Sequence, residues 1–454
     1  RPSWACGQDR RSFKALVMTM PPTPTLSQLE RSCGMLFYST TGKGINGKIR
    51  VKPEDFLVEE ITPEGYVVNE SLKTLSRGSG PYTLAVLKKR SRDLLPTLSL
   101  LQKLLKAKVS FAGIKDRRAV TYQLISISRP LTEPIRMNNL EVWAVGTSKW
   151  EVRPGELKGN RFTITIRSLD REDISTDVLP DLNWLPGYFG HQRFGITRPN
   201  THKVGKYMVK GEFEEAVREF LAEPYEGEPN RIFSIRLHLK TTWDLNVALS
   251  SMPSFLLYER EVIRALLSGA DYLHSLKSLP NRLIRLFVDS YQSYLFNLAL
   301  SERWSKYGLN YVAPGDIVSI LDSSLNPSRP IKVTHSNLEK LKKFVDSKKA
   351  VLLMPVPGSN LFVEGVNYQI YSEILEKEKI SPRNFSNVMG LEFRGTMRPA
   401  VFYPTDLEIL NPSEDELNPG KTKITIKFTL PRGFYATVLL RELMKPEDPK
   451  SAGF

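Results

Sequence analysis

The chain has 454 residues, of which 41% are hydrophobic and 25% charged, a composition typical of a globular protein with two or three domains. Its 64 Lys and Arg residues outnumber its 49 Asp and Glu residues, and the resulting net charge of +15 favours a polyanionic partner such as nucleic acid or an anionic membrane. Two isolated cysteines, histidines without HExxH spacing, and no GxxxxGK(S/T) or GxGxxG loop exclude a disulfide framework and the common metal and nucleotide motifs.

The first part of the chain is predicted to be rich in strands. Residues 1–45 mix Pro, Thr, Ser and Gly with weak periodicity and are expected to form a loose arm. Alternation of apolar and polar residues, or a short apolar run, predicts strands at residues 48–51, 56–60, 82–87, 119–127, 140–145 and 162–166. Leucines at helical spacing predict one helix over residues 94–106. Because these elements do not alternate as βαβ units, the pattern indicates an α+β fold.

Helices are predicted to dominate the middle of the chain, after Leu185-Pro186-Gly187. Their spacing places them at residues 204–221, 254–267 and 283–307, with a further helix near residues 336–345. Strands return near Arg398-Pro399, at residues 400–403 and 423–428. Strand-rich flanks around a helix-rich middle indicate that one domain is inserted into another.

The most informative segment covers residues 110–123, where two strand-like runs flank a short loop. One carboxylate in that loop, Asp116, lies beside three cations, Lys115, Arg117 and Arg118. Nearby cations favour the charged form of a carboxylate, and an ionised carboxylate can serve as a nucleophile or a base. The same cations could hold RNA phosphates. Since Lys, Asp and Arg are ordinary turn residues, these residue types alone favour a solvated hairpin turn over a catalytic loop.

This segment closely resembles the motif of TruD-type pseudouridine synthases, G-x-K-D-x-x-A-x-T-x-Q, whose Asp is the catalytic residue. The motif is complete here from Gly113 to Gln123. Further segments resemble the same family in the expected order, at residues 52–60, 158–162, 187–195, 291–297 and 430–437. The one departure is Gly187, where Asn is usual. Because the matches run in order over residues 52–442, the sequence is identified as a member of this family.

The resemblance implies an α+β catalytic domain with a mixed or antiparallel sheet, shared with other pseudouridine synthases. It also implies that a helix-rich insertion, characteristic of TruD proteins, interrupts this domain. We expect an N-terminal arm over residues 1–45, the catalytic domain over residues 46–185 and 400–454, and the insertion over residues 186–399.

The resemblance also implies a set of site residues around Asp116. Phe162 is expected to stack on the extruded uracil, although an amphipathic strand alone would make it a core residue. Asn160 has a donor and an acceptor and could hold either Asp116 or the uracil edge. Tyr435 is expected to cover the pocket. The remaining expected substrate-binding residues are cations: Lys52, Lys115 and Arg193.

The sequence allows more than one role for two further side chains. Arg193 is expected to contact a phosphate, against the alternative of a solvated loop cation. His191 is a possible acid or base by residue type, but the family carries other residues at this place. We therefore expect a structural or RNA-contacting role for His191.

The expected function is isomerisation of uridine to pseudouridine in tRNA, without metal or cofactor. Position 13 is favoured, because this compact form lacks obvious extra insertions. The alternatives are a non-catalytic tRNA-binding protein and the same isomerase acting on another tRNA or small RNA site. A methyltransferase is disfavoured because the sequence shows no Gly-rich cofactor loop. With no apolar stretch long enough to span a bilayer, we expect a cytoplasmic monomer whose partner is tRNA and not a membrane.

Overall fold

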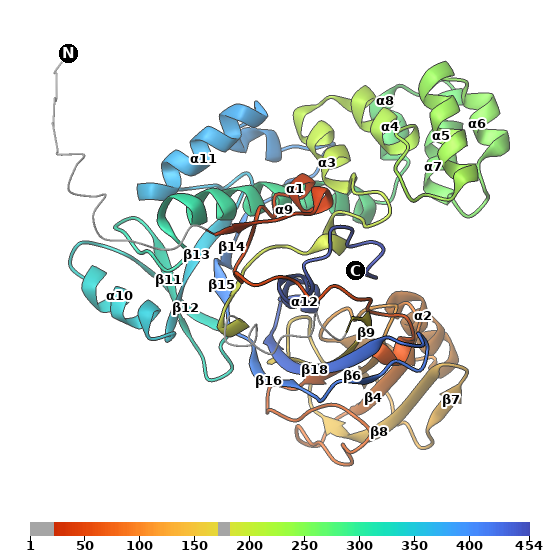
Figure 1. Cartoon of the computed structure of the whole chain (residues 1–454). Helices are drawn as coiled ribbons and strands as arrows, with labels where there is room; N and C mark the ends of the chain where they lie inside the picture. Colours follow the sequence, from red (N-terminus) through yellow and green to blue (C-terminus); the bar gives the residue numbers. More distant parts are fainter. Residues whose placement is uncertain (1–21, 171–181) are drawn as a thin grey trace.

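The computed structural model describes residues 22–170 and 182–454, and within them a mixed ten-stranded sheet forms the largest element (Figure 1). Its strands follow the order β16-β18-β9-β3-β6-β4-β8-β7, with β17 paired to β18 and β5 paired to β6. Their bounds are β3 (Phe56–Ile61), β4 (Tyr82–Arg90), β5 (Val109–Phe111), β6 (Val120–Ile127), β7 (Ile135–Met137), β8 (Leu140–Ser148), β9 (Gly159–Leu169), β16 (Thr405–Ile409), β17 (Ser413–Glu414) and β18 (Thr422–Pro431). Strands β3 and β6 are parallel, and the other paired neighbours are antiparallel.

Two helices cover one face of this sheet at opposite ends. Helix α2 (Leu94–Leu105) packs its leucines on β4, β6 and β8, and helix α12 (Ala436–Met444) packs on β9 and β18. The register pairs Val58 with both Thr121 and Phe162, so the middle strands present these side chains on that same face. Between α2 and α12 the face is therefore available to build a site.

The helix-rich part of the chain lies beside the sheet-rich part (Figure 1). Its helices are α3 (Thr201–Lys210), α4 (Phe213–Leu221), α5 (Asn230–Thr242), α6 (Leu245–Ser251), α7 (Leu257–Leu267), α8 (Tyr272–Lys277), α9 (Asn281–Tyr307), α10 (Leu338–Asp346) and α11 (Gly365–Glu378). A second sheet has the order β12-β11-β13-β14, with bounds β11 (Ile317–Leu321), β12 (Pro327–Lys332), β13 (Ala350–Val356) and β14 (Thr396–Pro399). Helices α3 and α9 approach so closely that a Cβ on Gly205 would lie 2.0 Å from the carbonyl oxygen of Phe287.

The two connections between these parts lie side by side. Strand β10 (Leu185–Pro186) pairs antiparallel with β15 (Val401–Phe402), and the Gly187 N–H donates to the Ala400 carbonyl at 2.7 Å. A Cβ on Gly187 would lie 2.0 Å from the Pro399 carbonyl oxygen, so this close crossing is suited to glycine. An inserted domain needs its entry and exit to be adjacent, and this pairing supplies that arrangement.

Several predicted elements differ from the structure. The predicted strand at residues 48–51 is wrong, because only an isolated bridge between Lys48 and Arg167 forms there and Arg50 has a φ of +57°. The predicted helix over residues 204–221 is two helices, since Gly211 ends α3 in the left-handed region with a φ of +77°. The apolar periodicity of the sequence did not predict α12. All residues of this helix are buried, so it has no apolar stripe opposite a polar face.

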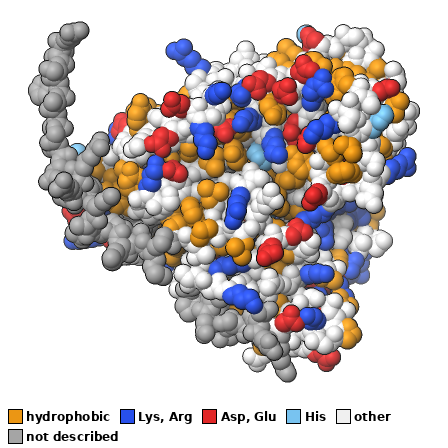
Figure 2. Space-filling model, turned by 45° about the horizontal axis from the view of Figure 1, so that its top comes forward, with side chains coloured by type: hydrophobic (Ala, Val, Ile, Leu, Met, Phe, Trp, Pro, Cys, Tyr) orange, Lys and Arg blue, Asp and Glu red, His pale blue; other side chains and the backbone are white. Residues whose placement is uncertain are grey.

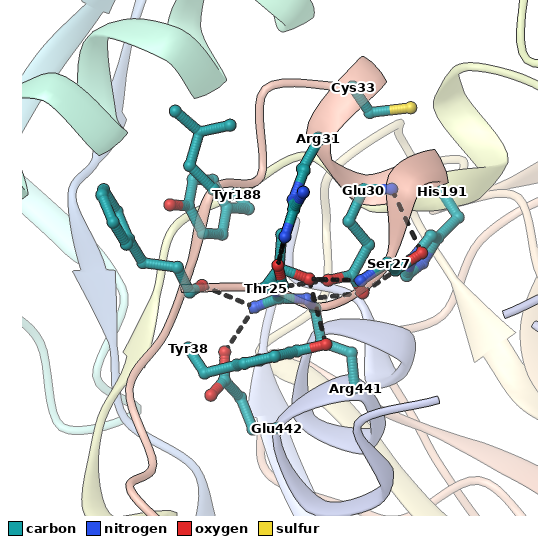
Figure 3. A network of polar contacts seen from close by, with 12 residues as sticks. Thr25, Ser27, Glu30, Arg31, Cys33, Tyr38, Tyr188, His191, Arg441 and Glu442 are labelled. Atoms are coloured by element: carbon teal, nitrogen blue, oxygen red, sulfur yellow. Dashed lines mark hydrogen bonds and ion pairs between the residues drawn. The ribbon is translucent and has the colours of Figure 1, made fainter. Parts of the chain in front are cut away.

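The expected loose arm is wrong for residues 22–45, and its first 21 residues lie outside the described part of the chain. The described part contains β1 (Thr23–Pro24), α1 (Gln28–Ser32) and β2 (Phe37–Tyr38). Glu30 of α1 is completely buried and lies between His191 and Arg441 (Figure 3). No helix among the described residues is long and apolar enough to cross a membrane.

The carboxylate of Glu30 joins three distant parts of the chain. Arg441 of α12 donates to it through Nη2 at 2.7 Å and Nε at 2.9 Å, and His191 Nε2 lies 3.0 Å from its Oε1. Thr25 donates to Oε2 at 2.5 Å. Burial alone would raise the pKa of Glu30, but the Arg441 charge and the bonds from His191 and Arg441 hold that pKa far below its usual range. Glu30 and Arg441 therefore form a buried ion pair, in which the Glu30 carboxylate also accepts from Thr25 and contacts His191.

Removing the charge of Glu30 is expected to destabilise the fold. Glu30→Gln leaves the buried guanidinium of Arg441 with Glu442 as its remaining carboxylate partner among the described residues, and the loss of one buried charge from this cluster should cost roughly 3 kcal/mol. Urea denaturation followed by fluorescence measures this loss. Glu54→Gln is the control, since Glu54 pairs with Arg90 on the surface; equal losses in the two variants would contradict the role given to Glu30.

Candidate active site

A cavity of about 420 Å³ opens on the sheet face between α2 and α12. Five of the seven site residues predicted from sequence line it: Lys115, Asp116, Asn160, Phe162 and Tyr435. They come from the loop before β6, from β9 and from the loop before α12. The structure thus brings together residues that are up to about three hundred positions apart in the sequence.

Asp116 lies in the loop between β5 and β6, with one carboxylate oxygen held on both sides. Its Oδ1 accepts from Arg50 Nη2 at 2.9 Å and from Gln192 Nε2 at 3.1 Å. The Asp116 side chain is 24% exposed, whereas that of Arg50 is 3% exposed. Among the described residues no donor binds Oδ2, so this oxygen is available to a molecule in the cavity.

The cation that pairs with Asp116 is Arg50 and not one of its sequence neighbours, which corrects the sequence-based expectation. Lys115 pairs with Glu60, Arg117 turns toward Asp93, and Arg118 donates to a backbone carbonyl. Sequence reasoning missed Arg50, although it lies two residues before the family-like segment that begins at Lys52. The sequence signal for Arg50 was its position shortly before a predicted strand, and arginines are too common there for this signal to select one residue.

Arg50 is held from three directions. Besides Asp116, its guanidinium contacts the Gly453 carbonyl through Nη1 at 3.2 Å and lies 4.1 Å from the centre of the Phe56 ring. Burial lowers the pKa of Arg50, and the charge of Asp116 acts in the opposite direction. Because a buried guanidinium needs a paired anion, the fold around Arg50 positions the Asp116 carboxylate as well.

A second cation, Lys89 on β4, holds the backbone of the same loop. Its side chain is fully buried, and Nζ donates to the carbonyl oxygens of Asp116 at 2.5 Å and Lys115 at 3.4 Å. Burial lowers the pKa of Lys89 to about 8, while the charge of Asp116 acts to raise it. Lys89 was not predicted; a lysine at an inward position of an otherwise apolar strand was the available signal.

Lys115, Glu60 and Asn160 form a polar cluster in the cavity wall. Lys115 Nζ lies 2.7 Å from Glu60 Oε2 and donates to Asn160 Oδ1 at 2.6 Å. The Lys115 and Glu60 side chains are 4% and 1% exposed. Lys115 is therefore a buried structural cation in this state and is not free to hold a phosphate.

Phe162 has features of both roles considered from the sequence, a core residue and a residue that contacts the base. Phe162 is 4% exposed and stacks on Phe428 with ring centres 5.2 Å apart, so it packs as a core residue. It nevertheless lines the cavity and can offer part of its ring to a base there. Tyr435, which precedes α12, is 36% exposed and lies at the cavity lining, as a covering residue would.

The structure does not bring Lys52 and Arg193 into this cavity. Lys52 Nζ lies on the surface 3.5 Å from Glu416. Arg193 lines a neighbouring cavity of about 490 Å³, which shares Arg432 and Phe434 with the first. In residues 187–195, the segment that contains Arg193, the residue that contacts Asp116 is Gln192, which the sequence analysis did not select.

Comparisons with known proteins show which family the chain resembles over most of its length. A family model described as tRNA pseudouridine synthase D (TruD) matches residues 32–443. The chain is 34% identical over 442 residues to the probable tRNA pseudouridine synthase D of Methanosarcina barkeri, covering 92% of this chain and 98% of the relative. It is 33% identical over 432 residues to the protein of the same name from Pyrobaculum islandicum, covering 94% and 98%.

A solved structure is also similar. The crystal structure of the putative tRNA pseudouridine synthase D from Methanosarcina mazei matches with a TM-score of 0.76 and 32% sequence identity, covering 93% of this chain and 99% of that one. This similarity confirms the α+β fold expected from the sequence.

The buried charge of Lys89 predicts a specific pH dependence of stability. Lys89 has a lower pKa in the folded chain, about 8, than in the unfolded chain, so the unfolded chain binds more protons between pH 8 and 10.5. The free energy of unfolding should therefore rise with pH across this window in the wild type, relative to Lys89→Met, by roughly 3 kcal/mol.

Urea denaturation at a series of pH values measures this difference. Lys88→Met is the matched control, because hydrogen bonding to Glu70 raises the pKa of the neighbouring Lys88 and leaves it charged throughout the window. Parallel stability curves for the wild type and Lys89→Met would contradict the shift assigned to Lys89.

Proposed function

Because the chain belongs to the TruD family of tRNA pseudouridine synthases, we propose that it converts uridine 13 of tRNA into pseudouridine with Asp116 as its catalytic carboxylate. The observation that carries the proposal is the state of that carboxylate. Oδ1 is held by Arg50 and Gln192, no donor among the described residues binds Oδ2, and Asp116 lines a cavity large enough for a base.

The reaction is a redox-neutral isomerisation. The bond between ribose C1′ and uracil N1 breaks, the uracil turns, a bond forms between C1′ and C5, and the C5 hydrogen leaves as a proton while N1 gains one. A carboxylate can start this by attacking C1′, by attacking C6 or by removing the C2′ proton. Each route needs one free carboxylate oxygen at the nucleoside, and Oδ2 of Asp116 meets that need.

The cavity suits a base that must be held while it is detached. A target base in folded RNA has to be turned out of its stack before chemistry. The buried rings of Phe162 and Phe56 supply apolar surface to the cavity, and the more exposed Tyr435 lies where the cavity meets solvent. A closed and partly apolar pocket keeps the detached uracil from escaping.

The neighbouring cavity supports an RNA contact beside the active site. Arg193, Arg398 and Arg432 line it, and within the described residues none of the three forms an ion pair with a carboxylate. Arg398 donates to the carbonyl oxygens of Gly187 and Tyr188 instead. Arginines without a carboxylate partner are suited to bind backbone phosphates, as expected for Arg193.

The net charge of the whole chain is also positive, but it is less specific evidence for an RNA contact than the arginines of the neighbouring cavity. On the face shown in Figure 2, Lys and Arg side chains lie among acidic and hydrophobic ones and do not form one uniform patch. The formal charge of +15 therefore supports an anionic partner in general. The arginines of the neighbouring cavity support a phosphate contact close to the Asp116 cavity, because the two cavities share Arg432 and Phe434.

The choice of position 13 rests on the compactness of the chain. The alignments with its relatives cover 97–98% of three of those chains and 92–94% of this one. The aligned part of this chain is therefore about as long as these relatives. RNA enzymes recognise mainly shape and unstacked bases. We therefore assign the choice of uridine to the helix-rich part, whose Gln192 lines the Asp116 cavity and whose Arg193 lines the neighbouring one.

Asp116→Asn is expected to abolish pseudouridine formation while RNA binding is retained. The change keeps the shape of the side chain but removes the carboxylate that every route requires. Turnover is measured by pseudouridine analysis of tRNA incubated with the purified variant. Asp93→Asn, the same change at an exposed position near α2, is the control and should keep wild-type activity; a rate within tenfold of wild type for Asp116→Asn would refute the assignment.

Pseudouridine mapping at single-nucleotide resolution tests the position. Total RNA from cells with and without the gene is compared, and the loss is expected only at position 13 of tRNAs. Complementation with the Asp116→Asn gene should not restore the modification. Loss confined to other tRNA or small RNA sites would refute position 13 and leave the chemistry of Asp116 intact.

A further inference from the structure

We propose that Trp150 is a stacking platform for the RNA base that lies next to the target uridine, and that Arg153 holds a phosphate beside that base. This inference rests on the function proposed above. It adds a contact with the RNA outside the Asp116 cavity and outside the neighbouring cavity lined by Arg193.

Trp150 exposes most of its side chain although its backbone is fixed. The residue is 69% exposed and lies in the loop between β8 and β9. The buried Ser148 side chain accepts the Trp150 N–H at 3.1 Å and donates to the Trp150 carbonyl at 2.7 Å. Two residues further on, the Val152 N–H donates to Ser126 Oγ at 2.8 Å. The apolar ring is therefore presented to solvent from an anchored loop.

The loop places this ring beside the active site. Trp150 lines a cavity of about 480 Å³, which shares Gly155 with the Asp116 cavity. Arg432 Nη1 donates to the Gly155 carbonyl at 2.9 Å, and Arg432 also lines both the Asp116 cavity and the neighbouring cavity. The three cavities therefore form a series in which the Asp116 cavity adjoins both others. An RNA strand that delivers a base to the middle cavity has its flanking nucleotides close to the outer two.

The charges around Trp150 suit a phosphate. The two carboxylates that line its cavity are already paired: Glu151 with Lys108 at 2.6 Å and Glu156 with Arg77 at 2.7 Å. Arg153 lines the same cavity and is exposed, and in the part of the chain that the structure describes its guanidinium forms no ion pair. An unpaired arginine next to an exposed aromatic ring is a combination suited to a nucleotide.

Extrusion of the target uridine creates a need for such a ring. When a base is turned out of the RNA, the adjacent base loses a stacking partner, which costs free energy. An aromatic side chain replaces that partner for any base, because every base has a π-face. Exposure alone does not select Trp150, since Phe255 and Phe362 are 70% and 74% exposed. Those two residues belong to the helix-rich part and line none of the three cavities.

Trp150→Ala tests the platform. We measure the affinity for an unmodified tRNA transcript in the Asp116→Asn background, which prevents turnover. Stacking of one base on an aromatic ring predicts that Trp150→Ala weakens binding about tenfold. Trp150→Phe keeps a ring and should restore most of this loss. Phe255→Ala removes an equally exposed ring outside the three cavities and should bind like its parent.

An abasic nucleotide in the tRNA identifies the stacked base. Two transcripts carry the abasic residue on one side or the other of the target uridine. At the position that contacts Trp150, loss of the base should weaken binding by about the same factor as Trp150→Ala. The two changes together should then weaken binding no further, because they remove the same contact.

Arg153→Gln tests the phosphate contact separately. It should lower the slope of log affinity against log salt by about one. Circular dichroism and melting temperature verify that each variant is folded.

Three results would overturn the inference: binding by Trp150→Ala within twofold of its parent, an equal loss in Phe255→Ala, or effects of Trp150→Ala and the abasic residue that add fully at both positions. Absence of pseudouridine formation by the wild type in a parallel assay would instead refute the proposed function.

Discussion

The ion pair between Arg50 and Asp116 is the contact on which the candidate active site depends. A buried guanidinium needs a paired anion, and the partners of Arg50 are the Asp116 carboxylate, the Gly453 carbonyl and the Phe56 ring. The packing of Phe56 and Gly453 around Arg50 therefore also determines where the carboxylate lies. Gln192, at the start of the helix-rich part, completes the arrangement on the same oxygen.

The Glu30 cluster stabilises segments that contribute residues to the same site. His191, which contacts Glu30, is the residue next to Gln192, and Arg441 belongs to the helix that follows Tyr435. One buried network thus connects Glu30 of the N-terminal segment with His191 and with Arg441 of α12 (Figure 3). Since several segments must meet for the cavity to exist, we expect stability and activity to be coupled in this chain.

The sequence predicted best where the information is local. Motif segments selected Asp116 and Asn160, which the structure places at one cavity, and apolar patterning located most of the strands of the large sheet. Spacing along one strand or loop is visible in the sequence. It could not show that Arg50 is the partner of Asp116, since the cations adjacent in sequence turn elsewhere. The burial of Glu30 was hidden for the same reason: its partner Arg441 lies 411 residues away, and polar residues without periodicity resemble a loose arm.

The most direct test of the account is a crystal structure of the Asp116→Asn protein bound to its substrate tRNA. The account predicts that the target uridine is turned out of the RNA and lies in the cavity, with its ribose next to the side chain of residue 116 and its flanking phosphates near the arginines of the neighbouring cavity. A complex in which the uridine stays stacked in the RNA, with its ribose far from residue 116, would contradict the assignment of this cavity as the active site.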